Sequence, residues 1–201
     1  ADSSISRDDF FKYKYDTQYS SNSVIAKVRD RYIKEMVNEK DPKLISALTL
    51  IKEWDLSADS SNTAAALAMI VLPNAFNEDD LNYEIEDITQ KLVETIDYLE
   101  TTFGKIDVPL GMVLRLVRGK TNLPLSGGPG LLRAIYFKKK DDMYVGRAGD
   151  CYFQAVEWGS NGELNAWSIH QFGSATSIES SIHYDDQAKL FSKHIMKQIR
   201  P

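Results

Sequence analysis

The sequence has 201 residues, of which 43% are hydrophobic and 26% charged, and this balance is typical of a globular protein with a sizeable core. The formal net charge of −5 argues against a nucleic acid or an anionic membrane as the main partner. No apolar run reaches membrane-spanning length, and the single cysteine, Cys151, excludes an intrachain disulfide.

The first half of the chain has the periodicity of helices. Ser23 is a suitable N-cap for a helix whose apolar stripe runs over 24–36. Asp41 followed by Pro42 predicts the start of a second helix, which ends near Trp54.

Two further helices are predicted before residue 105. Residues 63–72 are apolar on all sides, so this helix should be buried, with Ser60 or Ser61 at its start. Asn77 is expected to cap a long helix that ends just before Gly104.

The second half changes to strand patterns. Glycines at 127–130 predict a turn, 159–162 predicts a hairpin turn, and Lys138–Asp142 reads as a solvated hairpin tip. A last helix should begin near Asp185 or Asp186 and include Ile195 and Met196. The expected strands are 133–137, 143–147, 151–158 and 164–172.

These patterns predict an α+β fold. A helical segment at 1–104 is followed by an antiparallel strand segment at 105–201 that closes with a helix.

The stretch 168–191 holds most of the residues with chemical potential. His170, His183 and Asp185 or Asp186 are of the types that bind metals or transfer protons, but the histidine spacing matches no standard zinc pattern. Ser174, His170 and Asp186 have the composition of a catalytic triad, although no G-x-S-x-G motif is present. The alternative is structural, with His170 in a strand and His183 bracing the last helix.

Other features favour structural roles. Ser126–Gly130 lacks the Lys-Ser/Thr of a phosphate-binding loop and precedes a strand. Cys151 is expected within a strand as a small buried hydrophobe. The three tryptophans are expected in the core or at its rim: Trp54, Trp158 and Trp167.

Several short motifs, in this order, resemble the penicillin acylase family, especially its aculeacin and acyl-homoserine-lactone acylase branch. The matching stretches are Leu50–Asp55, Ala58–Ser60, Ala64–Ala65, Val108–Gly111, Arg118–Gly119, Leu123–Gly130, Gly149–Tyr152, Ile169–Ser174 and His183–Gln187. The chain departs from the pattern at Cys151, where serine is usual, and at the apolar Leu110, Met112 and Leu114.

The resemblance implies the C-terminal part of the large chain of an N-terminal-nucleophile hydrolase with an αββα fold. Such enzymes hydrolyse an amide of an N-acyl compound: a β-lactam side chain, a lipopeptide acyl tail or an acyl-homoserine lactone. A serine at the start of the large chain attacks, and its own α-amine acts as base. An asparagine and a backbone N–H stabilise the oxyanion.

Because the chain begins at Ala1, we expect the nucleophile, the oxyanion asparagine and most of the acyl pocket to lie upstream. We therefore expect no catalytic residue, cofactor or metal in this chain, and no activity from it alone. The resemblance implies structural roles for a set of signature residues: Trp54, Asp55, Asp59, Gly127, Gly128, Gly149, Asp150, His170, Gln171, Gly173, Ser174, His183, Tyr184, Asp186 and Gln187.

The expected partners are the N-terminal part of the enzyme and a small N-acyl substrate, in the bacterial periplasm or medium. The alternative is a non-catalytic binding module that derives from the same fold. An exposed sheet edge would make the isolated chain self-associate. A third option is a metal hydrolase that uses His170 and His183.

Overall fold

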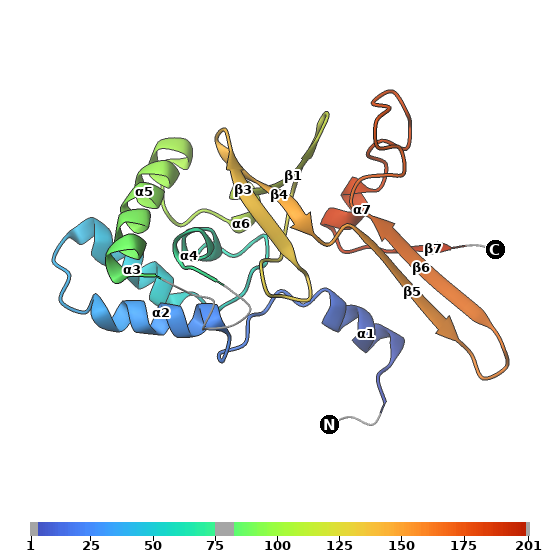
Figure 1. Ribbon diagram of the computed structural model, residues 1–201, viewed down its shortest axis with the longest axis horizontal. Helices are drawn as coiled ribbons and strands as arrows, with labels where there is room; N and C mark the ends of the chain where they lie inside the picture. The colour runs from blue at the N-terminus through green and yellow to red at the C-terminus, as the bar shows by residue number, and fades with distance from the viewer. Residues whose placement is uncertain (1–3, 75–82, 200–201) are drawn as a thin grey trace.

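The computed structural model describes residues 4–74 and 83–199, and in these ranges helices come mostly first and strands second, which confirms the predicted α+β class (Figure 1). The helices are α1 (Arg7–Lys14), α2 (Val24–Glu35), α3 (Pro42–Glu53), α4 (Ala65–Val71), α5 (Ile85–Phe103), α6 (Leu110–Val113) and α7 (Ala188–Ser192).

Helices α2 to α5 lie together at one end of the molecule (Figure 1). Every residue of α4 is buried, as its uninterrupted apolar sequence predicts. Asp41 caps α3, because its side chain accepts a hydrogen bond from the Lys43 N–H at 2.8 Å. Gly104 ends α5 with a positive φ of 77°. The predicted starts of α2 and α3 and the ends of α3 and α5 are confirmed.

The predicted starts of α4 and α5 are not confirmed. The capping of α4 by Ser60 or Ser61 is wrong. Asn62 Oδ1 instead accepts hydrogen bonds from the N–H groups of Ala64 and Ala65, and α4 begins at Ala65, two residues after the predicted start at Thr63. Asn77 lies outside the described residues, and α5 as described has Glu84 as its N-cap.

The strands form two sheets. The first has the order β2–β1–β4–β3 and lies against the helices. Its strands are β1 (Leu114–Arg118), β2 (Thr121–Pro124), β3 (Ile135–Lys140) and β4 (Met143–Gly149). The second has the order β5–β6–β7 and extends from the opposite end. Its strands are β5 (Tyr152–Trp158), β6 (Leu164–His170) and β7 (Lys197–Ile199).

The first sheet is mixed rather than a simple antiparallel meander. Leu114 and Arg115 of β1 pair in parallel with Tyr144 and Val145 of β4. The sequence analysis did not predict β1 and β2, whose hairpin turns at Gly119 with a φ of 54°. The predicted hairpin tip is confirmed, since only Asp141 and Asp142 separate β3 from β4.

The second sheet is a long hairpin with a short third strand. β5 pairs with β6 over seven residues, and the predicted turn at 159–162 is confirmed by the Gly162 N–H, which donates to the Gly159 carbonyl at 3.0 Å. The predicted extent of the last helix is wrong: α7 ends at Ser192, and β7 begins one residue after Met196.

Helix α1 packs on one face of this second sheet. Phe10 stacks on Phe153 with ring centroids 6.2 Å apart, and Phe11 meets the edge of Trp167 at 5.8 Å. The opposite face of this sheet carries exposed apolar side chains. Its cross-strand register places one exposed apolar set together: Tyr152, Val156, Trp158, Leu164 and Ile199. We call this set the apolar sheet face.

The prediction for Cys151 is wrong. The residue precedes β5 rather than lying in a strand, and its side chain is exposed. Of the tryptophans, Trp54 is buried and Trp167 half-buried under α1, whereas Trp158 is 74% exposed at the end of the hairpin.

Candidate functional site

The closing stretch of the sequence forms a seam between β6 and α7. Gln187 is buried, its Oε1 accepts a hydrogen bond from the His170 N–H at 3.0 Å, and its own N–H donates to the Phe172 carbonyl at 2.7 Å. A Cβ at Gly173 would lie 2.1 Å from the His183 carbonyl oxygen, so the backbones approach too closely for any side chain there. This geometry supports a structural role for the segment.

The structure separates the members of the possible triad. Asp186 pairs with His183, with Nδ1 and Oδ2 3.1 Å apart, on the exposed surface. The His170 ring contacts Tyr152 instead, with centroids 5.3 Å apart. Ser174 is exposed and, in the part of the chain that the structure describes, has no hydrogen bond to His170. No acid–base–nucleophile relay is assembled here.

The same residues offer no metal centre. Among residues 4–74 and 83–199, no three or more His, Cys, Asp or Glu side chains are grouped so that they could hold a metal ion. His170 and His183 therefore have no third ligand within the described structure.

The β1–β2 hairpin supports the loop that precedes α7. Arg118 lies 4.2 Å over the Tyr184 ring and donates to the Ala175 carbonyl at 3.0 Å. A Cβ at Gly119 would lie 2.9 Å from Tyr184 Cε1. Thr121 also donates a hydrogen bond to Asp185. The Arg118–Gly119 motif and the Tyr184 motif, 65 positions apart, are thus in direct contact.

The glycine turn at 127–130 also contacts the Ala58–Ser60 motif. The Gly127 N–H donates to the Ala58 carbonyl at 2.9 Å, and the buried Ser126 Oγ accepts from the Ser60 N–H at 2.9 Å. A Cβ at Gly128 would lie 2.3 Å from the Tyr19 hydroxyl. These contacts support the predicted structural role of the turn.

The carboxylates of Asp55 and Asp59 accept hydrogen bonds from residues close to them in the sequence. Asp55 Oδ1 accepts hydrogen bonds from the Ser57 N–H and from Asn62 Nδ2, at 3.0 and 2.8 Å. Asp59 Oδ1 accepts from the N–H and hydroxyl of Ser61. Burial raises the pKa of Asp59, but the hydrogen bonds from Ser61 outweigh this and lower the pKa overall.

Asp150 anchors a buried charged junction. Its Oδ2 lies 2.6 Å from Lys14 Nζ and 3.1 Å from Arg133 Nη1. Arg133 is 1% exposed, lies 4.0 Å over the Phe191 ring and donates to the Phe191 carbonyl at 3.1 Å. Burial lowers the pKa of Arg133, and Asp150 opposes the shift. The junction joins α1, the start of β3 and α7.

The sequence analysis missed the histidine with the most perturbed environment. His194 follows α7, and its ring stacks on Tyr15 with centroids 4.8 Å apart and planes 5° apart. Burial, with repulsion from Arg133, lowers the pKa of His194 to about 4. In the sequence His194 lies inside the predicted last helix, and no local pattern reveals a partner 179 positions upstream.

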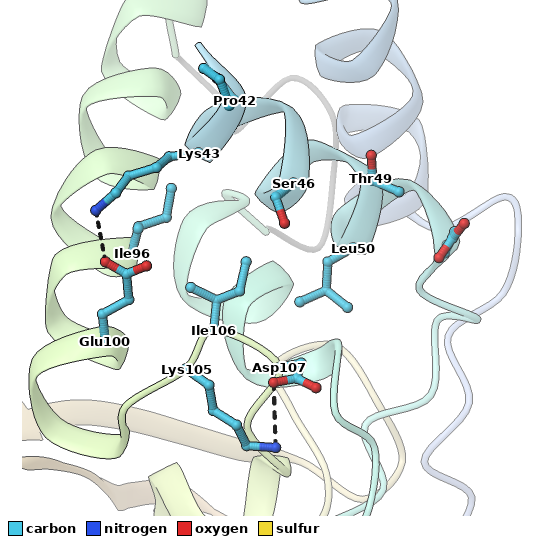
Figure 2. A pocket seen from close by; sticks show the side chains of 11 residues that line it. Pro42, Lys43, Ser46, Thr49, Leu50, Ile96, Glu100, Lys105, Ile106 and Asp107 are labelled. Atoms are coloured by element: carbon cyan, nitrogen blue, oxygen red, sulfur yellow. Dashed lines mark hydrogen bonds and ion pairs between the residues drawn. The ribbon is translucent and has the colours of Figure 1, made fainter.

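A hollow of about 630 Å³ lies between α3, α5 and the loop at 105–107 (Figure 2). Four of its charged side chains form two pairs, Lys43 with Glu100 at 3.0 Å and Lys105 with Asp107 at 3.3 Å, and Glu53 also lines it. Figure 2 shows Ser46, Thr49 and Leu50 on α3 and the aliphatic side chains of Ile96 and Ile106 nearer the two pairs. The lining includes no histidine or cysteine, so we assign no chemistry to this hollow.

The motifs therefore build a scaffold in which turns, seams and a buried charge junction meet, and the α+β arrangement is consistent with an N-terminal-nucleophile hydrolase fold. A family model described as penicillin amidase matches residues 1–200, and the chain belongs to this family of amide-bond hydrolases. No curated protein matches the chain significantly. None of the described helices is long and apolar enough to cross a membrane.

Proposed function

We propose that this chain is the C-terminal part of an acylase that hydrolyses the amide bond of an N-acyl compound through a serine N-terminal nucleophile. The observation that carries the proposal is the match of the penicillin amidase family over residues 1–200. The proposed substrates are those of the resembling branch: β-lactam side chains, lipopeptide acyl tails and acyl-homoserine lactones. Periplasmic or secreted bacterial localisation follows from the same resemblance.

The described residues support a scaffolding role within that enzyme. Motifs that are distant in sequence meet pairwise, as Gly119 does with Tyr184 and Gly127 with Ala58. The side chains of these motifs are engaged in hydrogen bonds and packing, and among residues 4–74 and 83–199 no nucleophile of the motifs is paired with a base. The nucleophile and the acyl pocket are proposed to be supplied by other parts of the enzyme.

The test compares this chain with the native enzyme. Purified native protein should deacylate at least one member of a panel made of a chromogenic phenylacetyl amide, a lipopeptide and an acyl-homoserine lactone. The 201-residue chain alone should be inactive on the same panel and should restore activity when it is combined with the remaining chain or chains. Deacylation by the 201-residue chain alone would contradict the proposal that other parts of the enzyme supply the nucleophile and the acyl pocket.

A second candidate function is a non-catalytic binding module, and the apolar sheet face favours it. Trp158 and Leu164 are 74% and 60% exposed on that face, and β5 is an edge strand. An isolated chain with such a face should self-associate. In the native enzyme, the remaining part of the acylase is proposed to cover the apolar sheet face. If the native protein deacylates nothing in the panel but binds a partner through this face, the second function holds.

A further inference from the structure

His194 occupies a backbone position that usually takes glycine. Its φ is +60°, its N–H donates to the Phe191 carbonyl at 3.3 Å, and the next N–H, of Ile195, donates to the Leu190 carbonyl at 2.9 Å. This pair of hydrogen bonds is the Schellman ending of α7, in which the left-handed residue is most often glycine. A residue with a Cβ costs about 1 kcal/mol there, so a side-chain contact must offset the strain.

The offsetting contact is the parallel stack on Tyr15, at the end of α1. Arg133 lies 5.7 Å from the same ring. Three polar atoms of this cluster are buried without a hydrogen-bond partner: His194 Nε2, the Tyr15 hydroxyl and Arg133 Nε. Buried polar atoms of this kind are rare in folded proteins. A neutral imidazole tolerates the position better than a charged one, because burial penalises the charged ring.

Burial is the main factor that opposes protonation of His194, and the surrounding charges act in both directions. Arg133 and Lys14 disfavour the imidazolium, whereas Asp59 and Asp150 favour it, and burial adds to the cost. Asp150 is already engaged by both Lys14 and Arg133. Lys193, the residue directly before His194, is also positively charged. A proton on the ring therefore weakens the stack.

His194 also connects α7 to β7. Strand β7 starts three residues later, has three residues in its ladder with β6, and is exposed along its whole length. In the described structure this strand is held by its ladder with β6 and by Met196, which packs on the core directly before it. We propose that His194 is an acid-sensitive latch, which keeps β7 on β6 while its ring is neutral and stacked on Tyr15 and releases the strand when the ring takes up a proton.

The test is amide hydrogen exchange of the native protein between pH 7 and pH 4.5, followed in the peptide that covers 193–199 and corrected for intrinsic exchange. Because the pKa of His194 falls from 6.5 to about 4 on folding, the opening equilibrium of this peptide should rise about ten- to fifty-fold over that range. The peptide that covers β5 (Tyr152–Trp158) should not follow the same profile.

Two variants separate the latch from general acid sensitivity. His194→Phe keeps an aromatic ring over Tyr15 but does not titrate, so the rise should disappear. His183→Gln removes an exposed histidine and should retain the wild-type profile. An unchanged rise in His194→Phe, or constant protection of wild-type β7 across the pH range, overturns the proposal.

A measurement on the wild type covers the case in which His194→Phe does not fold. The His194 ring is titrated by NMR while the β7 amide signals are followed. Coincident midpoints support the latch, and midpoints more than one pH unit apart overturn it. Both tests are independent of acylase activity, so they stand or fall separately from the proposed function.

Discussion

Gln187 Oε1 accepts the N–H of His170 at 3.0 Å, and this one hydrogen bond ties α7 to the last residue of β6. Gln187 is 7% exposed, so water does not readily replace its side chain. The bond lies where two stretches of the family motif, Ile169–Ser174 and His183–Gln187, come together.

Replacement of Gln187 by alanine should lower the free energy of unfolding by about 1–3 kcal/mol, because the partner N–H loses its acceptor. Gln154→Ala is the matched control, since Gln154 is exposed on β5, and its effect should stay within about 0.5 kcal/mol. Urea unfolding monitored by fluorescence measures both. Equal effects of the two changes would show that the seam does not depend on this bond.

Arg133→Ala should cost about 3–5 kcal/mol, because it removes a buried cation from Asp150 and from the Phe191 ring. Arg147→Ala, on the exposed part of β4, should cost less than about 0.5 kcal/mol. A double-mutant cycle with Asp150→Asn measures the coupling. Strict additivity of the two changes would contradict a direct interaction between them.

Gly128→Ala should destabilise the protein by about 1–3 kcal/mol through overpacking, because the new Cβ would lie 2.3 Å from the Tyr19 hydroxyl and 2.6 Å from Met69 Cε. Tyr19→Phe removes the nearer atom and should recover part of the loss. For comparison, Gly162→Ala meets no atom within 4 Å and tests the cost of its φ of 82° alone. Thermal unfolding of the single variants and of the Gly128→Ala, Tyr19→Phe double variant distinguishes a steric clash from backbone strain. If the double variant is no more stable than Gly128→Ala alone, the clash with the Tyr19 hydroxyl is contradicted.

The apolar sheet face should drive self-association of the isolated chain. Trp158→Lys with Leu164→Lys places two charges on the face and should shift sedimentation towards the monomer. Val93→Lys alters a half-exposed apolar residue on α5 and should leave the association unchanged. A wild-type chain that sediments as a monomer at high concentration would rule this behaviour out.

Acid should weaken the fold through His194. The folded-state pKa of about 4 lies below the unfolded value of 6.5, so the unfolded state binds more protons between these values. The stabilisation is fully present above pH 6.5 and is lost as pH falls towards 4, to an extent of about 2–3 kcal/mol. Denaturant midpoints at pH 7.5, 6, 5 and 4.5 in wild type and His194→Phe measure it; parallel curves would contradict the assignment.

Local signals in the sequence determined helices α2 to α5 and the β3–β4 and β5–β6 hairpins, but not α1, α6 or the β1–β2 hairpin. Asp41 before Pro42 and Gly104 after a long apolar stripe act within one turn of a helix, and so they can be read without knowledge of the fold. The hairpin turn at 159–162 is equally local. The order of the short motifs was sufficient for the family, which the match over residues 1–200 confirms.

Only the tertiary structure decided which distant groups meet. The parallel pairing of β1 with β4, the end of α7 at Ser192 and the exposure of Cys151 depend on long-range packing that no local pattern encodes. His194 shows the reason most clearly. Its stack on Tyr15 and its lowered pKa, which comes from burial and from Arg133, depend on the packing of α1, the start of β3 and α7 against one another.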